Sequence, residues 1–142
     1  MAEKKRYEQY KRGDVVYADF GCNPNGVEGG IRPGVIVSCN ASNHAGAPMV
    51  TVCPLSTKLK NIPVHVQIKP NDIAGYRLKA VSDFLPEDIQ TVSKKAIRGK
   101  TGYIPVEAEV MELIDRALIR QLQLYKAARA MVLEELENGS ED

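Results

Sequence analysis

The chain has 142 residues, of which 44% are hydrophobic, and its formal net charge is +1. This length and apolar content fit one domain with one core, because domains cluster around about 100 to 150 residues. No stretch approaches the roughly 20 consecutive apolar residues that a membrane span requires, and residues 1–10 are polar and rich in lysine, unlike a signal peptide. We therefore expect a cytoplasmic protein that does not bind membranes.

Residues that commonly hold metals are sparse in this sequence. Cys22, Cys39 and Cys53 are odd in number and widely spaced, with no CxxC pair, which favours neither a disulfide framework nor a zinc site. Cys39 and Cys53 lie in apolar runs, so we expect both to pack as small hydrophobic side chains. His44 and His65 are the only histidines, and we interpret both as structural or solvent-facing side chains. We expect no metal and no other cofactor.

Charge is distributed unevenly along the chain. Residues 56–101 contain nine Lys and Arg against four Asp and Glu, whereas residues 102–142 contain four against nine. A basic middle segment can attract phosphates and an acidic tail repels them. Surface lysines that serve only solubility would give the same pattern.

The first two thirds of the sequence alternate between short apolar runs and segments rich in Gly and Pro. The predicted strands are residues 14–20, 34–39, 49–53, 64–68, 78–82 and 88–92, with a loop at 21–33 and a basic turn at 94–100. Many short strands with such connections predict a small, strongly curved antiparallel barrel or sandwich.

After Pro105 the apolar residues recur at helical spacing. They are Val110, Leu113, Ile114, Ala117, Leu118, Leu122, Tyr125, Ala128, Val132 and Leu136. This pattern predicts an amphipathic C-terminal helix with at most one break. The fold class is therefore α+β and mainly β.

Two segments could carry chemistry. The loop at 26–33 delivers Arg32 into a strand, where a planar guanidinium suits a phosphate or a developing phosphorane. The strand that ends near Leu55 is followed by Ser56, Thr57, Lys58 and Lys60, whose hydroxyls and ammonium groups can hold an RNA backbone. Taken alone, each segment fits an ordinary loop or turn equally well.

Together and in this order, these segments resemble the MazF/PemK family of toxin endoribonucleases. The matching segments are RGDV at 12–15, GGIRP at 29–33, LS at 55–56, PVHV at 63–66 and IQTVSK at 89–94, followed by the helix to residue 124. The resemblance covers about four-fifths of the chain. It implies an SH3-like barrel, a homodimer, and metal-independent cleavage of single-stranded RNA at a short sequence, the activity of an mRNA interferase.

The resemblance also implies the site. The family's catalytic arginine corresponds to Arg32 and its catalytic threonine to Ser56, which keeps the hydroxyl but loses the methyl group that stiffens the rotamer. Glu28 and Glu87 are the candidates for general base. Gln90 stands where many relatives carry arginine, which removes one phosphate contact.

Further expectations concern partners and boundaries. The family implies a cognate antitoxin that folds along the toxin surface. Residues 11–124 would form the toxin domain, after a polar leader at 1–10 and before a helical extension with an acidic end at 125–142. We expect the extension's apolar stripe to pack on a dimer or on its own barrel, with a dedicated partner-binding helix as the alternative.

Two other functions fit the same sequence. Toxins of the same fold poison DNA gyrase through an aromatic-containing C-terminus, but this chain has no Trp and ends in GSED. Alternatively, Arg32 and Ser56 hold nucleic acid or a protein segment without catalysis.

Overall fold

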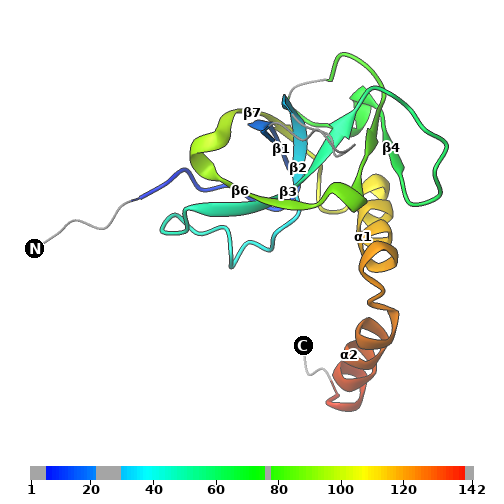
Figure 1. The fold of residues 1–142 in the computed structure, drawn as a ribbon. Coiled ribbons are helices and arrows are strands. Elements are labelled where there is room, and N and C mark those ends of the chain that lie inside the picture. Colours follow the sequence, from blue (N-terminus) through cyan, green and yellow to red (C-terminus); the bar gives the residue numbers. More distant parts are fainter. Residues whose placement is uncertain (1–5, 22–29, 76–77, 140–142) are drawn as a thin grey trace, which may run out of the picture.

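The computed structural model describes residues 6–21, 30–75 and 78–139. Within these residues, seven antiparallel strands form a sheet in the order β4-β5-β3-β2-β1-β7, with β6 paired to β3 (Figure 1). The strands are β1 (Asp14–Asp19), β2 (Ile31–Ile36), β3 (Met49–Ser56), β4 (Val66–Ile68), β5 (Ser82–Phe84), β6 (Gln90–Ser93) and β7 (Ile97–Tyr103). The helices are α1 (Glu109–Leu122) and α2 (Tyr125–Glu137), and single 3-10 turns are η1 (Pro70–Asp72), η2 (Pro86–Asp88) and η3 (Lys94–Ala96).

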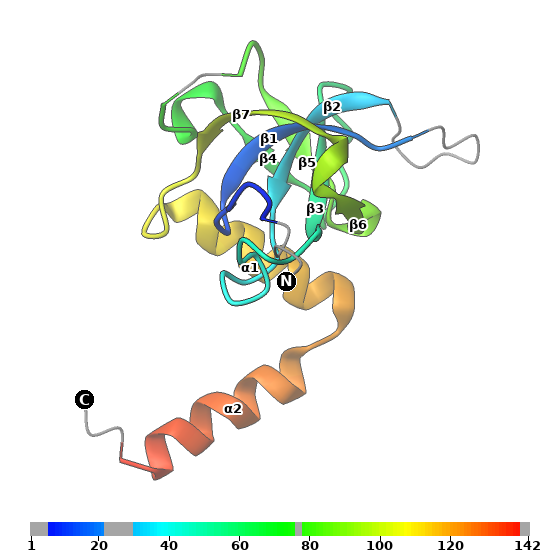
Figure 2. The same ribbon diagram turned by 90° about the vertical axis from the view of Figure 1, so that its left-hand side faces the viewer.

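The predicted α+β class and the curved antiparallel sheet are confirmed. The sheet bends strongly, as Figure 2 shows, but it is not a closed barrel. One isolated bridge, Ala74 to Tyr103, links the segment after η1 to β7, and each residue donates its N–H to the other's carbonyl, at 2.8 and 3.0 Å. This bridge brings the two ends of the sheet together without a full strand pairing.

Some predicted boundaries were wrong. β2 begins at Ile31 because Arg32 and Pro33 pair with β1, so the loop predicted to reach residue 33 is shorter. The predicted strand at 78–82 lies later, as β5. The basic turn predicted at 94–100 is instead η3 followed by β7. The residues of β7 are largely exposed to solvent and its pairing with β1 shifts register twice, so its sequence shows no alternation of apolar and polar residues.

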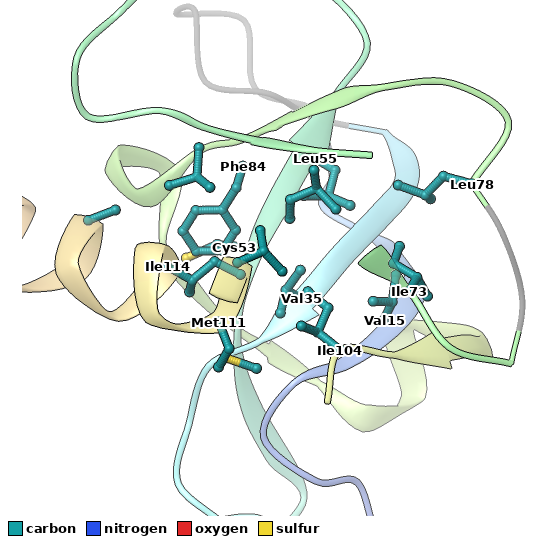
Figure 3. Close-up of a cluster of buried hydrophobic side chains, with 14 residues drawn as sticks. Val15, Val35, Cys53, Leu55, Ile73, Leu78, Phe84, Ile104, Met111 and Ile114 are labelled. Atoms are coloured by element: carbon teal, nitrogen blue, oxygen red, sulfur yellow. The ribbon is translucent and has the colours of Figure 1, made fainter. Parts of the chain in front are cut away.

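The core is divided between the two faces of the sheet. On the α1 face, a first cluster includes Val35, Leu55, Phe84, Ile104 and Ile114 (Figure 3). On the opposite face, a second cluster contains Tyr10, Val16, Ala18, Phe20, Ile36, Val50, Val52 and Val92. Successive side chains of a strand point to opposite faces, so β1, β2 and β3 each contribute to both clusters. The chain length predicted a single core, but the structure has two separate clusters of buried side chains.

The two described cysteines differ in environment. Cys53 is buried in the first cluster, as expected, and burial raises the pKa of its thiol to about 12. Cys39 is exposed, so its prediction was wrong, because it lies beyond the end of β2 rather than within a buried strand. Cys22 lies outside the described residues.

Helix α1 is anchored by one narrow stripe. Val110, Met111, Ile114 and Ala117 are buried, at i, i+1, i+4 and i+7, so they lie on one face of the helix. Leu113, which the periodicity had placed on that stripe, is 49% exposed. The ten apolar residues of the predicted pattern belong to two separate helices, α1 and α2, which have different environments.

The turn before β1 ties the sheet to α1. The guanidinium of Arg12 donates to the carbonyl oxygen of Val37 at 3.1 Å and to Asp115 on α1 at 2.6 Å. Gly13 has a φ of +96°, and a Cβ there would lie 2.8 Å from the Met111 side chain. Asp14 is buried and accepts the N–H of Lys11 at 2.8 Å. The RGD part of the RGDV segment therefore serves the fold.

The end of the predicted leader covers the second cluster. Tyr10 is only 7% exposed, and the backbone N–H of Tyr7 donates to the carbonyl oxygen of Ala45 at 2.6 Å. The ammonium of Lys94 lies 6.0 Å from the Tyr7 ring and 5.9 Å from the Tyr10 ring, and donates to the carbonyl oxygen of His44 at 3.0 Å. Burial under this cover lowers the pKa of Lys94.

The close packing at Gly34 gives a stability prediction. A Cβ at Gly34 would lie 2.6 Å from a methyl of Val52 and 2.9 Å from the Phe20 ring, whereas a Cβ at Gly99 would meet nothing within 4 Å. Gly34→Ala should therefore lower the free energy of unfolding by about 1–3 kcal/mol, through overpacking. Gly99→Ala should leave it nearly unchanged. Urea unfolding measures both, and equal effects would contradict the packing described here.

Candidate functional site

The candidate site lies where β3 changes partner. On one edge β3 pairs first with β6, up to Val52 opposite Gln90, and then with β5, from Leu55 opposite Phe84. Residues 85–89, which include η2, bridge the interval as an arch, held at its start by the Leu85 N–H to the Pro54 carbonyl at 3.1 Å. Because β3 changes partner, η2 lies outside the strand pairing, beside the end of β3.

A cleft of about 120 Å³ opens under this arch. The residues that line the Ser56 cleft are Ser56, Lys58, Lys60, His65, Leu85, Glu87 and Asp88. Four residues predicted from the sequence therefore meet there: Ser56, Lys58, Lys60 and Glu87. Ammonium groups, carboxylates, an imidazole and a hydroxyl share this small space.

Ser56 lies at the buried end of β3. It is 4% exposed, pairs with Asp83 of β5, and its hydroxyl accepts the N–H of Lys58 at 3.2 Å. The serine therefore has the turn-forming role considered from the sequence, and it also lines the cleft. Both follow from its position as the last residue of the strand.

Arg32 lies at the same end of the sheet. Gly34 is opposite Pro54 in the β2–β3 ladder, and Arg32 and Ser56 each lie two residues further toward the same end. Side chains two residues apart share a face, so Arg32 and Ser56 project from the same face. Arg32 is directly opposite Ala18, which belongs to the second cluster, so Arg32 and Ser56 both lie on the face of the sheet that carries the second cluster. Arg32 is half-buried and does not line the Ser56 cleft itself.

The remaining predicted residues are spread more widely. Gln90 begins β6 opposite Val52, and its side chain donates to the Asp88 carbonyl at 3.4 Å. Thr57 is exposed in the turn after β3. Glu28, the other candidate base, lies outside the described residues.

Two residues that the sequence did not assign to the site connect its polar groups. His65 donates or accepts through Nδ1 with Asp83 at 3.2 Å and through Nε2 with Glu87 at 2.5 Å. Its side chain is 3% exposed and that of Asp83 is 1% exposed, whereas Glu87 is 36% exposed. Asp83 also accepts the backbone N–H of Lys60 at 2.8 Å. A buried carboxylate thus orients the imidazole, which in turn orients Glu87 at the cleft opening.

These contacts determine the protonation of His65. Burial of the ring opposes protonation, but the hydrogen bonds and charges of Glu87, and then of Asp83, outweigh it, so the pKa of His65 is raised above its usual 6.5. An imidazolium between two carboxylates can donate from both nitrogens. When it is protonated, His65 is therefore a positive centre that holds Glu87 in a fixed orientation.

Neither a metal cluster nor a membrane helix is found in the part of the chain that the structure describes. No group of three or more His, Cys, Asp or Glu side chains there could hold a metal ion. None of the described helices is long and apolar enough to cross a membrane.

Comparison with known proteins then shows the family. A family described as PemK-like, MazF-like toxin of type II toxin-antitoxin system matches residues 11–122. The chain belongs to this family. The PemK/MazF match ends at the last residue of α1, so α2 lies beyond it.

Individual relatives agree with this family. The chain is 29% identical to endoribonuclease EndoA of Bacillus subtilis over 116 residues, which are 80% of this chain and 95% of that protein. A solved endoribonuclease from a mycobacterial species matches with a TM-score of 0.65 and 25% identity, covering 84% of this chain and 96% of that one. A mycobacterial endoribonuclease solved with its cognate antitoxin matches with a TM-score of 0.64 and 28% identity, covering 81% and 96%. MazF from Deinococcus radiodurans, 19% identical with a TM-score of 0.66 over 82% and 98% of the two chains, shares the fold.

The raised pKa of His65 gives a prediction for NMR titration. The imidazole of His65 should titrate with a midpoint above 6.5, and Glu87→Gln should lower that midpoint by removing the nearer carboxylate charge. Because the folded-state pKa is raised, the stability that protonated His65 contributes is fully present below about pH 6.5 and is lost as pH rises through the folded-state value. His44→Gln leaves a single histidine signal for assignment, and a midpoint at or below 6.5 would contradict the described contacts.

Proposed function

We propose that this toxin is a metal-independent endoribonuclease that cleaves single-stranded RNA, including mRNA, at a short sequence. The observation that carries the proposal is the Ser56 cleft, where a hydroxyl, two lysines and an oriented carboxylate meet at the same end and face of the sheet as Arg32. Membership of the PemK-like, MazF-like family and the likeness to EndoA support the same activity. The gyrase-poisoning and non-catalytic alternatives have no such observation in their favour.

The reaction uses the one group that RNA has and DNA lacks. The ribose 2′-oxygen attacks the adjacent phosphorus, the bond from phosphorus to the 5′-oxygen breaks, and a 2′,3′-cyclic phosphate and a 5′-hydroxyl result. In this proposal the Arg32 guanidinium stabilises the charge of the phosphorane, and the Ser56 hydroxyl holds a phosphate oxygen or the 2′-hydroxyl. No metal ion enters these steps.

We assign the general base to Glu87. Its carboxylate is at the cleft opening and is oriented by His65, which Asp83 holds from the buried side. In this role Glu87 takes the proton from the 2′-hydroxyl, water supplies a proton to the departing 5′-oxygen, and the hydroxide that remains takes the proton back from Glu87. Glu28 is the second candidate for the base.

The remaining predicted residues bind the RNA strand. Lys58 and Lys60 line the cleft and supply positive charge for the phosphates, while Thr57 and Gln90 flank it and can hydrogen-bond to the backbone or bases. Because the lysines are exposed, binding should weaken as salt rises.

The proposed partners follow from the family. A cognate antitoxin would fold along the toxin surface and block the RNA site, and two copies of the chain would form a homodimer. We propose the cytoplasm as the compartment, since the substrate is found there. Residues 11–124 form the proposed toxin domain, with Tyr7 and Tyr10 of the leader at 1–10 packed against it and an extension at 125–142.

Cleavage of RNA in EDTA tests the activity directly. The pure protein should cut single-stranded RNA and leave a 2′,3′-cyclic or 3′-phosphate opposite a 5′-hydroxyl, identified by mass spectrometry. Arg32→Ala should reduce the rate by roughly 100-fold to 1,000-fold, the usual effect of losing a donor to transition-state charge, and Ser56→Ala should also reduce it strongly. A 2′-deoxy nucleotide at the cut should abolish scission.

The controls are residues of the same types outside the site. Arg116→Ala removes an exposed arginine of α1 that pairs with Glu112, and Ser42→Ala removes an exposed hydroxyl before β3. Both should keep full activity. Cleavage of all-DNA strands, or full activity in both the Arg32 and Ser56 variants, would contradict the proposal.

The identity of the base has its own test. If Glu87 accepts the proton, Glu87→Gln should lower kcat by roughly 100-fold to 10,000-fold and remove the acidic limb of the pH–rate profile. Glu28→Gln should then retain that limb. The opposite result would transfer the role to Glu28 without affecting the assignment of Arg32 and Ser56.

A further inference from the structure

Helix α2 has almost no contact with the rest of the described chain. None of its 13 residues is buried, and only Ala128 is half-buried. Figures 1 and 2 both show it leading away from the sheet after the left-handed residue Gln123, which has a φ of +56°. The expected packing of this extension on its own barrel is therefore absent.

An apolar stripe nonetheless runs along α2. Tyr125, Ala128, Val132 and Leu136 recur at spacings of three and four residues, so they share one face. Tyr125, Val132 and Leu136 are 56%, 55% and 69% exposed. Such a stripe is the usual signature of a helix face that is covered by another element.

The charges of α2 are arranged against its own dipole. Lys126 and Arg129 lie in its first half, and Glu134, Glu135 and Glu137 lie in its second half. Negative charge near a helix C-terminus and positive charge near its N-terminus are both unfavourable. The helix also has no side-chain N-cap, and an isolated helix of this length is marginal in water. A second element is needed to stabilise it.

We propose that α2 pairs in antiparallel orientation with α2 of a second copy of this chain. In that orientation the basic half of each helix lies along the acidic half of the other, and the apolar stripes face each other. The arrangement that destabilises a single helix thereby becomes complementary in a pair. A parallel pair would instead place like charges side by side.

This interface is separate from the proposed RNA site. It lies beyond the family match at 11–122, so it can add to any contact that the barrels make with each other. It also stands whether or not the chain cleaves RNA. The occupant is a second copy because α2 itself carries both halves of the required charge pattern.

Disulfide cross-linking in the full-length chain tests the pairing and its direction. In a Cys22→Ser, Cys39→Ser background, Val132→Cys lies near the helix midpoint and should form disulfide-linked dimers under mild oxidation. Tyr125→Cys alone should not form such dimers. In an antiparallel pair Tyr125 lies opposite Leu136 of the second helix, so the two Tyr125 positions are 11 residues apart, or roughly 16 Å along the helix axis. A mixture of Tyr125→Cys and Leu136→Cys chains should form mixed dimers.

Charge reversal provides the matched control. Lys126→Glu with Arg129→Glu should reduce cross-linking of Val132→Cys chains roughly fivefold, by opposing acidic residues to each other. Adding Glu134→Lys, Glu135→Lys and Glu137→Lys should restore it. RNA cleavage should be unchanged in these variants, which shows that the barrel is intact.

Three results would overturn the proposal. The first is no cross-linking of Val132→Cys chains at any protein concentration where the chain stays folded. The second is efficient cross-linking of Tyr125→Cys chains to themselves, which indicates a parallel pair. The third is cross-linking of α2 only to an added antitoxin, which identifies a different occupant.

Discussion

The side chain of Asp83 connects most parts of the candidate site. In the middle of β5 it lies opposite Ser56 of β3 and Gln67 of β4, so it is fixed by pairing on both edges. Its carboxylate accepts the Lys60 N–H and contacts His65, which leads to Glu87 at the surface. A charge this deeply buried is tolerable only because these partners compensate for lost hydration. The loop after β3, the histidine and the arch are thereby held in one arrangement.

The site combines residues at strand ends with residues on the connection between β5 and β6. Ser56 pairs with Asp83 of β5 and Arg32 pairs with Ala18 of β1, so both backbone positions have little freedom. Only Cys53 and Pro54 separate the β3 residues that pair with β6 from those that pair with β5, whereas five residues, 85–89, connect β5 to β6, and the excess length forms the arch that carries Glu87. Charged groups on a short connection with both ends fixed can be substituted without repacking the sheet.

Local patterns in the sequence predicted the candidate groups but not how they meet. Arg32, Ser56, Lys58, Lys60 and Glu87 came from segment order and family resemblance. The contacts of His65 did not, because its partners lie 18 and 22 residues away and only strand pairing brings them together. β7 was missed because its exposed residues carry no alternation. The α1 stripe was only partly correct, since periodicity cannot show where one helix ends and another begins.

The cover formed by Tyr7 and Tyr10 has a practical consequence. The family match begins at residue 11, immediately after Tyr10. A chain trimmed to that boundary would lose both rings that enclose Lys94 and would open the side of the second cluster to water. The ammonium would regain hydration and its ordinary basicity, while the bared apolar surface would favour aggregation. Sequence boundaries drawn from family similarity would thus remove part of the hydrophobic interior.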